Sequence, residues 1–367
     1  MRRFIFLILT VIIFNLFMQP KDGQTSPKPY VSAANAVLLE ANSNRVLYEK
    51  ESDEQVPIAS ITKVMTAIVA IEYGQLDDVV SVSERAIQTE GSSIYLNKGE
   101  QMTLEDLLYG LMLRSGNDAA NAIAEHIGGS IEGFVHLMNE KAAYIGMTRT
   151  NFANPHGLDD DKHYSTAYDI AILMSYAMKN EIFQTISSTK SYMSSNRTYA
   201  WHNKNKLLTS LYEHCNGGKT GFTRRAGRTL VTTAQKNGMD LIAVTLNAPN
   251  DWNDHISLYE WGYSTYELIQ LERERKQTYV IANEKTKGYI ENDFFYPLAE
   301  SERKQVRKKV QLYRYEKDYP SREIGKIIFE IDDEEVIKRI YKSKRKNRFS
   351  HTFKNTFFDM IGWKHDG

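Results

Sequence analysis

Apolar residues recur at helical spacing through much of the first half of the chain. From Ser60 onward, one face of a predicted helix carries Ile61, Val64, Met65, Ile68 and Val69. Further helices are predicted over Leu104–Met112, Asp118–Ile127, Ile131–Ile145 and Thr166–Met178. Short apolar runs instead predict strands over Ala36–Glu40, Arg45–Tyr48, Leu230–Gln235 and Leu241–Leu246.

The order of these elements predicts the fold class. Strands lie at both ends of the segment, and helices lie between them. Residues Ala41–Asn44 have the composition of a turn, so the first two strands are expected to form a hairpin. The two late strands are expected to pair with a strand that carries Lys219. An antiparallel sheet covered by helices satisfies this order, and we predict a fold of the α/β (α+β) class.

The N-terminal residues have the composition of a targeting signal. Arg2 and Arg3 precede an apolar run that extends to Met18, as in a secretory signal peptide. An uncleaved membrane anchor is the alternative, but the run is short for a membrane span. The segment Lys21–Tyr30 has the composition of a linker. We expect residues 1–30 to be signal peptide and linker, and the protein to be exported to the outer face of the cytoplasmic membrane or the cell wall.

Composition and charge narrow the classes of function. The chain has 46 Lys and Arg residues against 46 Asp and Glu residues, so no global basic surface is expected for nucleic acid. Its single cysteine excludes an intramolecular disulfide framework. The histidines lack the H-E-x-x-H spacing of a zinc site. No metal and no other cofactor is therefore predicted.

Ser60 and Lys63 form a candidate catalytic pair at the start of the first predicted helix. They lie one turn apart, so their side chains point to the same side. A serine hydroxyl needs a base to take its proton, and a lysine whose charge is suppressed can be that base. The pair alone is weak evidence, because serine is a common helix N-cap.

Two further motifs follow this pair along the chain. They are Ser115-Gly116-Asn117 and Lys219-Thr220-Gly221. Each alone is an ordinary loop or turn sequence. Together, the three ordered elements make up the signature of the penicillin-recognising serine enzymes, with Ser-Gly-Asn where other branches have Ser-Asp-Asn.

Other segments extend this resemblance over about residues 34–270. The sequence resembles the D-alanyl-D-alanine carboxypeptidases, low-molecular-mass penicillin-binding proteins of the S11 peptidase group, at Ala34–Lys50, Asn154–Leu158 and His163–Asp169. The resemblance implies a penicillin-binding-protein/β-lactamase-like catalytic domain over residues 31–272. It also implies a small C-terminal β-rich domain over residues 273–343.

The resemblance implies roles in acylation for the motif residues. Ser60 attacks the peptide bond between two D-alanines of a peptidoglycan stem pentapeptide, and Lys63 accepts its proton. Lys219 lies close by, and its charge keeps the Lys63 amine partly neutral. Ser115 relays the proton to the leaving amine, and Asn117 offers its amide to the substrate backbone. β-Lactam antibiotics are expected to react with Ser60 as covalent inhibitors.

The third motif is expected to bind the end of the substrate. By the resemblance, Lys219 and Thr220 bind the terminal carboxylate through charge and a hydrogen bond. Gly221 lets the strand approach the substrate closely, because it has no side chain. The backbone N–H groups of Ser60 and Phe222 form the oxyanion hole.

One departure from the resemblance concerns arginine. Many relatives carry an arginine downstream of the Lys-Thr-Gly strand that helps to hold the substrate carboxylate, but residues 229–272 contain none. Carboxylate binding is then expected from Lys219 and Thr220, or from an arginine such as Arg224 or Arg225.

Three alternatives compete with this interpretation. A class A β-lactamase shares the acylation chemistry but deacylates through an added glutamate, and no glutamate occurs between Lys141 and Asn180, where it is expected. A non-catalytic peptidoglycan-binding protein would not need the full set of reactive side chains. A thiol nucleophile at Cys215 beside His214 is disfavoured, because neighbours in a strand point to opposite faces; Cys215 is instead expected to pack near the site.

The stretch Asn247–His255 resembles carboxypeptidases of spore-forming Gram-positive bacteria. This resemblance gives the hypothesis of a role in spore cortex modification.

The C-terminal residues 344–367 form a basic, aromatic-rich tail. Residues 338–354 include many lysines and arginines and no acidic residue. Apolar residues then recur at helical spacing at Phe349, Phe353, Phe357, Phe358 and Ile361. The pattern predicts a membrane-surface anchor, and hence peripheral membrane contact. The alternative is that the aromatic residues pack onto the small domain.

Overall fold

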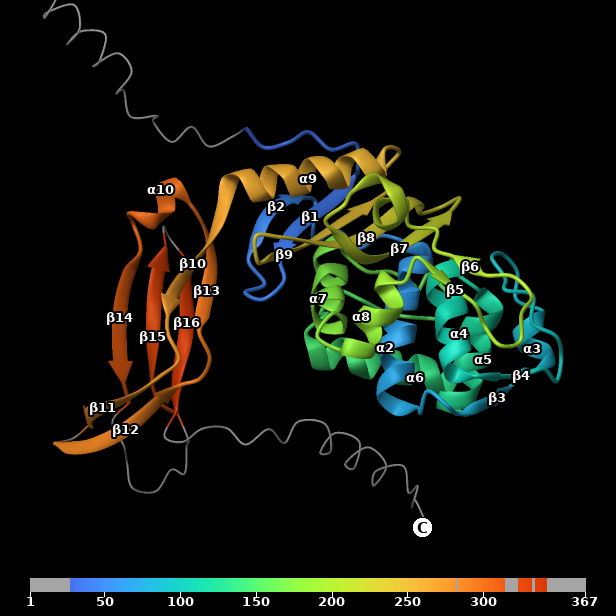
Figure 1. The fold of residues 1–367 in the computed structure, drawn as a ribbon, viewed down its shortest axis with the longest axis horizontal. Coiled ribbons are helices and arrows are strands. Elements are labelled where there is room, and N and C mark those ends of the chain that lie inside the picture. Colours follow the sequence, from blue (N-terminus) through green and yellow to red (C-terminus); the bar gives the residue numbers. More distant parts are fainter. Residues whose placement is uncertain (1–26, 282, 314–322, 332–333, 342–367) are drawn as a thin grey trace, which may run out of the picture.

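A five-stranded antiparallel sheet forms the centre of the larger part of the molecule (Figure 1). The structure is a computed structural model, and it describes residues 27–281, 283–313, 323–331 and 334–341. The strand order is β2-β1-β9-β8-β7, with bounds β1 Asn35–Glu40, β2 Val46–Lys50, β7 Cys215–Thr223, β8 Gly227–Lys236 and β9 Met239–Leu246. The first strand therefore pairs with one of the last, and Val37 lies opposite Val244.

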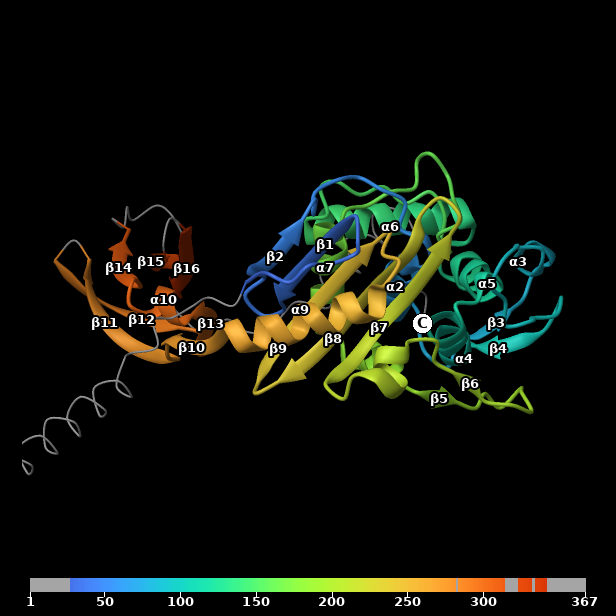
Figure 2. The same cartoon turned by 90° about the horizontal axis from the view of Figure 1, so that it is seen from above.

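Helices cover both faces of this sheet, so its strands are buried on both sides. One face packs against a helical layer made of η1 Ala59–Thr62, α2 Lys63–Tyr73, α4 Leu104–Tyr109, η2 Gly110–Arg114, α5 Asn117–Gly128, α6 Ile131–Ile145, α7 Ala167–Ala177 and α8 Glu181–Ser188. The other face packs against α9 Asp251–Thr265 (Figure 2). Alternate side chains of β1 enter the two cores: Val37 faces the helical layer and Leu38 faces α9.

Helix α2 is the central helix of the helical layer. Every residue from Lys63 to Ile71 is buried. Other elements therefore cover this helix on all sides, as is typical of a helix inside a core. Short elements complete this part of the chain: β3 Val79–Ser81, α3 Glu84–Ile87, β4 Gln101–Thr103, β5 Ser191–Tyr192, β6 Trp201–His202 and η3 Leu207–Leu211.

The C-terminal part is a separate β-rich unit beside the β1–β2 hairpin (Figure 1). Its sheet has the order β11-β12-β16-β15-β14, with β11 Arg275–Ile281, β12 Glu284–Ile290, β14 Arg307–Leu312, β15 Glu323–Ile331 and β16 Glu334–Tyr341. A second pair joins β10 Tyr266–Glu272 to β13 Phe294–Ala299, and α10 Glu300–Arg303 follows. Isoleucines 290, 324, 327 and 340 form its core with Phe329.

The predicted fold class is confirmed. The predicted helices and strands differ from the observed ones mainly at their ends, whereas α8 and α9 were not predicted. Helix α6 has the predicted bounds, Ile131–Ile145. The helix predicted over Leu104–Met112 continues to Arg114 as a π-helix. Strand β10 pairs with β13 of the β-rich unit, although it precedes the domain boundary that we predicted at residue 273. Among the described residues, no helix is long and apolar enough to cross a membrane. The predicted signal peptide and the tail from residue 344 lie outside the described residues.

Arg45 connects the β1–β2 hairpin to the β-rich unit. Its guanidinium forms an ion pair with Glu302 of α10, and the two side chains are 11% and 12% exposed. It also lies over the rings of Tyr266 and Tyr296, at 5.4 and 5.1 Å from their centroids. The pair is thus shielded from water, and loss of one partner leaves the other charge buried.

We expect Arg45→Ala to lower the free energy of unfolding by about 3 kcal/mol, because the Glu302 carboxylate loses its buried partner. Urea denaturation followed by circular dichroism measures this change. The matched control is Arg85→Ala, whose ion pair with Glu132 is exposed and is expected to contribute little. Equal effects of the two substitutions would contradict a structural role for Arg45.

Candidate active site

Ser60 lies in the short helix η1, directly before α2. Its side chain is partly exposed, whereas Lys63 begins α2 and is fully buried. The turn between them brings Lys63 Nζ to 3.0 Å from Ser60 Oγ. A nucleophile that solvent and substrate can reach is therefore in hydrogen-bond contact with an amine inside the protein.

Two further oxygen atoms surround the Lys63 amine. Asn117 Oδ1 lies 2.7 Å from Nζ, and the backbone oxygen of His156 lies 2.6 Å from it. Burial lowers the pKa of Lys63 well below the ordinary lysine value, and the positive charges of Lys219 and Lys204 lower it further. A neutral amine donates its two protons to these two oxygens. Its lone pair then faces the Ser60 hydroxyl, as a general base requires.

Lys219 is the second buried amine of the site. It reaches from β7 to Ser115, where Nζ lies 3.0 Å from Oγ, and it donates to the oxygen of Thr220 at 2.7 Å. Burial, followed by the charge of Lys204, lowers the pKa of Lys219 to about 7. Ser115 follows the π-helix η2 with a left-handed backbone, φ 66°. The structure thus brings the first residue of each motif into one cluster.

Asn117 lies in this cluster, but its contacts differ from those that the resemblance implies. Its Oδ1 faces Lys63, and its Nδ2 donates to the oxygen of Glu90 at 2.6 Å. Both ends of the amide are therefore engaged within the protein. The Nδ2 group has a second N–H, which can donate to the substrate backbone while the bond to Glu90 is kept.

Strand β7 places the third motif beside Ser60. It is the edge strand of the described sheet, so one row of its backbone groups faces away from the other strands. Gly221 lies against η1: a Cβ at this position would lie 2.9 Å from the Ser60 nitrogen and 2.4 Å from Thr229 Oγ1. Only glycine fits this approach. Thr220 is partly exposed and Phe222 is exposed at the same edge.

Sequence reasoning missed four residues that hold either the start of η1 or the Lys63 amine. The Thr229 hydroxyl donates to the oxygen of Ile58 at 3.0 Å. The Thr62 hydroxyl donates to the oxygen of Ala59 at 2.8 Å and lies 2.7 Å from His163 Nε2. The fourth, His156, contributes its carbonyl to Lys63. Thr62 lies inside the first motif, and both histidines lie in stretches that carry the family resemblance, but their partners are distant in sequence.

Cys215 packs beside the site and is not an activated thiol. Burial raises its pKa to about 11, and Sγ contacts Asn205 and the oxygen of Gly217. The thiol therefore stays protonated near neutral pH. Within the described ranges, no group of three or more His, Cys, Asp or Glu side chains is arranged to hold a metal ion.

The arginines after the third motif have different partners. Arg225 forms an ion pair with Asp161 at 2.6 Å, and Arg228 pairs with Asp251 at 2.6 Å. Arg224 is exposed at the turn between β7 and β8. Two of the three are thus already paired with aspartates in the described structure.

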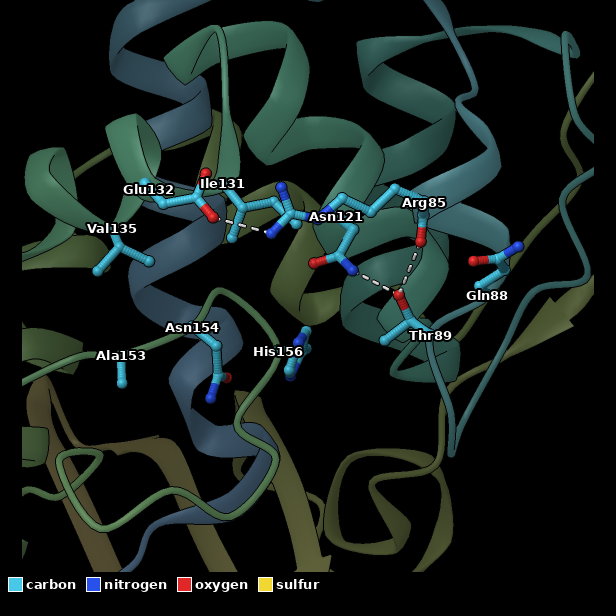
Figure 3. A pocket seen from close by; sticks show the side chains of 10 residues that line it. All are labelled: Arg85, Gln88, Thr89, Asn121, Ile131, Glu132, Val135, Ala153, Asn154 and His156. Atoms are coloured by element: carbon cyan, nitrogen blue, oxygen red, sulfur yellow. Dashed lines mark hydrogen bonds and ion pairs between the residues drawn. The ribbon is translucent and has the colours of Figure 1, made fainter.

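A pocket of about 550 Å³ lies beside the segment 153–156 (Figure 3). The side chains of Asn154 and His156 line it, and the ion pair between Arg85 and Glu132 lies across it. His156 therefore has two contacts: its side chain lines the pocket, and its backbone carbonyl contacts Lys63. Burial and the charge of Lys63 lower the pKa of His156 to about 3. The imidazole is neutral near pH 7 and adds no positive charge beside Lys63.

These features define the class of the protein. A helix-borne serine with a buried lysine one turn away, and a second buried lysine on an edge strand that contacts a second serine, are the machinery of penicillin-recognising serine hydrolases. The family model for D-alanyl-D-alanine carboxypeptidase matches residues 22–250. The chain belongs to this family of serine-type peptidases.

Relatives and solved structures agree with this assignment. The chain is 38% identical to D-alanyl-D-alanine carboxypeptidase DacF of Bacillus subtilis, over 70% of this chain and 69% of that protein. It is 35% identical to DacC of Escherichia coli, over 67% of this chain and 65% of that protein. It is also similar to the structure of penicillin binding protein 5 from Haemophilus influenzae, with a TM-score of 0.74 and 28% identity over 86% of this chain and 97% of that one.

We expect Lys204→Gln to move the acidic limb of the acylation rate to higher pH. The Lys204 charge lowers the pKa of both Lys63 and Lys219. Its removal raises both pKa values, so less Lys63 is neutral at a given acidic pH and acylation is slower there. The second-order rate constant with a fluorescent penicillin, measured across pH, gives the shift. Lys206→Gln, at an exposed neighbouring lysine, is the control; an unmoved limb in Lys204→Gln would contradict this electrostatic coupling.

Proposed function

We propose that this chain is a serine D,D-carboxypeptidase that removes the terminal D-alanine from peptidoglycan stem pentapeptides through an acyl-enzyme on Ser60. The observation that carries the proposal is the contact between Ser60 Oγ and a buried Lys63 amine whose pKa is lowered. Family membership supports the same activity. β-Lactams acylate the same serine and act as covalent inhibitors.

Acylation uses the cluster as follows. Lys63 Nζ takes the proton of the Ser60 hydroxyl while Oγ bonds to the carbonyl carbon between the two D-alanines. The backbone N–H groups of Ser60 and Phe222 stabilise the negative oxygen of the tetrahedral intermediate, and such a donor is typically worth ~10²–10³ in rate. The proton on Lys63 passes through the Ser115 hydroxyl to the leaving nitrogen. The C–N bond then breaks and D-alanine leaves.

In deacylation, water takes the place of the serine hydroxyl as the nucleophile, and Lys63 again accepts the proton. A water molecule gives a proton to Lys63 as its oxygen attacks the ester carbon. Ser60 Oγ takes that proton back as the ester bond breaks, and the shortened peptide is released. The segment that would carry the glutamate of a class A β-lactamase, residues 141–180, contributes the His156 carbonyl to Lys63. The segment contains no glutamate, which disfavours a deacylating carboxylate and leaves Lys63 as the base for hydrolysis.

Substrate binding falls to the third motif. We assign the terminal carboxylate to Lys219 and Thr220, because Lys219 is already held at the site by Ser115. The ion pairs of Arg225 and Arg228 with aspartates weigh against their use for the carboxylate. Asn117 orients the Lys63 amine through its Oδ1.

The assay that tests this function is release of D-alanine from diacetyl-Lys-D-Ala-D-Ala. We expect the chain to release D-alanine, and Ser60→Ala to lower the turnover number by at least about 10⁴-fold, because the nucleophile is absent. Ser60→Ala should also lose labelling by a fluorescent penicillin and keep its thermal unfolding midpoint. Ser195→Ala, an exposed serine, is the control. Labelling that persists in Ser60→Ala would overturn the assignment of the nucleophile.

The role of Lys63 as a base is tested by Lys63→Arg. Arginine keeps the positive charge but is not deprotonated in proteins, so we expect acylation to slow by about 10²–10⁴-fold, the range of general-base catalysis. Stopped-flow labelling with a fluorescent penicillin measures the rate, and Lys98→Arg at an exposed ion pair serves as control. Acylation near the wild-type rate would show that Lys63 acts only through its charge.

We further propose that the enzyme acts outside the cytoplasm, at the outer face of the membrane or in the wall, and that the tail 344–367 contacts the membrane surface. Family membership supports the extracytoplasmic site of action. The tail proposal is supported by its sequence, since each basic residue near an anionic bilayer contributes ~1 kcal/mol. The hypothesis of a spore cortex role stays a prediction from the stretch Asn247–His255.

Deletion of residues 344–367 tests the tail. Because basic and aromatic residues are removed together, we expect sedimentation with anionic vesicles to be lost while D-alanine release from soluble peptide is retained. Neutral vesicles serve as the control for charge. Unchanged vesicle binding, or an unfolded product, would favour packing of the tail onto the β-rich unit.

A further inference from the structure

The residue before Ser60 has an unusual backbone conformation. Ala59 is buried and adopts φ 51°, a region that residues with a Cβ rarely enter. The loop residue Gly157 lies against it: a Cβ on Gly157 would lie 2.0 Å from the Ala59 oxygen. The Ala59 carbonyl is therefore confined by its neighbours, and the surrounding structure must hold the peptide in this orientation.

A chain of three hydrogen bonds holds that carbonyl. His163 Nδ1 accepts from the backbone N–H of Ala153 at 3.1 Å. A neutral imidazole that accepts at Nδ1 carries its proton on Nε2, so Nε2 donates to Thr62 Oγ1 at 2.7 Å. The Thr62 hydroxyl then has one proton to give, and it donates to the Ala59 oxygen at 2.8 Å.

The buried setting keeps the direction of this chain fixed. Thr62 is fully buried and His163 is 3% exposed, so water does not compete for these groups. Burial also lowers the pKa of His163 to about 4, which keeps the imidazole neutral near pH 7. Each proton in the chain therefore has one acceptor.

The Ala59 carbonyl and the Ser60 N–H belong to one peptide unit. In a planar trans peptide these two groups point in opposite directions. A hydrogen bond that fixes the carbonyl therefore also fixes the N–H. The Ser60 nitrogen lies beside β7, 2.9 Å from the position of a Cβ on Gly221, where the edge strand approaches η1.

We propose that Thr62 and His163 are positioning residues that aim the backbone N–H of Ser60 at the oxygen of the reacting carbonyl. The inference rests on the proposed function, because it assigns this N–H to the oxyanion hole. Neither side chain contacts the substrate. They act through Ala59, and their effect falls on the acylation step rather than on binding.

Thr62→Val and Thr62→Ser form the test pair. Valine keeps the shape of threonine without its hydroxyl, whereas serine keeps the hydroxyl. With a fluorescent penicillin, we expect Thr62→Val to lower the saturating acylation rate constant by about 10- to 100-fold, below the loss of a whole oxyanion donor. The dissociation constant should stay within about threefold in both variants, and Thr62→Ser should acylate within about threefold of wild type. Wild-type acylation in Thr62→Val, or equal slowing in both variants, would overturn the proposal.

His163 gives an independent test, which also decides the matter if Thr62→Val fails to fold. Asparagine places an acceptor near the Ala153 N–H but does not reach Thr62, whereas glutamine places an N–H near the position of Nε2. We expect His163→Asn to slow acylation as Thr62→Val does, and His163→Gln to be faster than His163→Asn. Wild-type acylation in His163→Asn, or equal slowing in the two variants, would overturn the proposal.

Labelling of Ser60→Ala separates this inference from the proposed function. If Ser60→Ala is still labelled, the nucleophile itself is wrong and the proposed function fails with this inference. If labelling is lost in Ser60→Ala and Thr62→Val acylates normally, the proposed function stands and only the positioning role is overturned.

Discussion

The site depends on keeping one lysine amine neutral inside the protein. Lys63 and Lys219 are both buried, and taking an ammonium group out of water strongly disfavours its charge. The Asp118 carboxylate raises the pKa of Lys63, but by less than burial and the charges of Lys219 and Lys204 lower it. The hydrogen-bond partners of Lys63 are a hydroxyl, an amide oxygen and a backbone carbonyl, which satisfy N–H groups but stabilise an ammonium less than a carboxylate would.

The fold supplies these contacts from separate elements around a central helix. Lys63 belongs to α2, Lys219 to the edge strand β7, and Ser115 to the turn after η2. The loop before residue 157 is bonded to α2 twice, since Thr66 donates to the Pro155 oxygen and Lys63 contacts the next carbonyl. Packing of α2 on all sides is thus the condition under which these carbonyls stay near the amine. Within the described residues, the β-rich unit contributes no contact to Lys63, Lys219 or Ser115.

The sequence was sufficient for elements and motifs whose signal is local. Helix Ile131–Ile145 was predicted with its bounds, because its start after Ser130 and its end before Gly146 carry ordinary capping residues. The pairing of Ser60 with Lys63 also followed from helical spacing. The contact between Thr62 and His163 was not predictable in this way, because no periodicity links residues that meet only after folding. The engagement of Asn117 with Glu90 was missed for the same reason. The pairing of β10 with β13 was also not predicted, since it is not visible in the residues of β10 alone.

The most direct test of the account is the ionisation of Lys63 itself. Carbon-13 labelling of the lysine side chains, with Lys63 assigned from the spectrum of Lys63→Arg, allows its titration to be followed by NMR. The account predicts a Lys63 pKa well below that of an ordinary lysine, and a rise in that pKa when the charge of Lys204 is removed by Lys204→Gln. A Lys63 that titrates like a lysine in water, about pH 10.4, would contradict the claim that this amine is the base that activates Ser60.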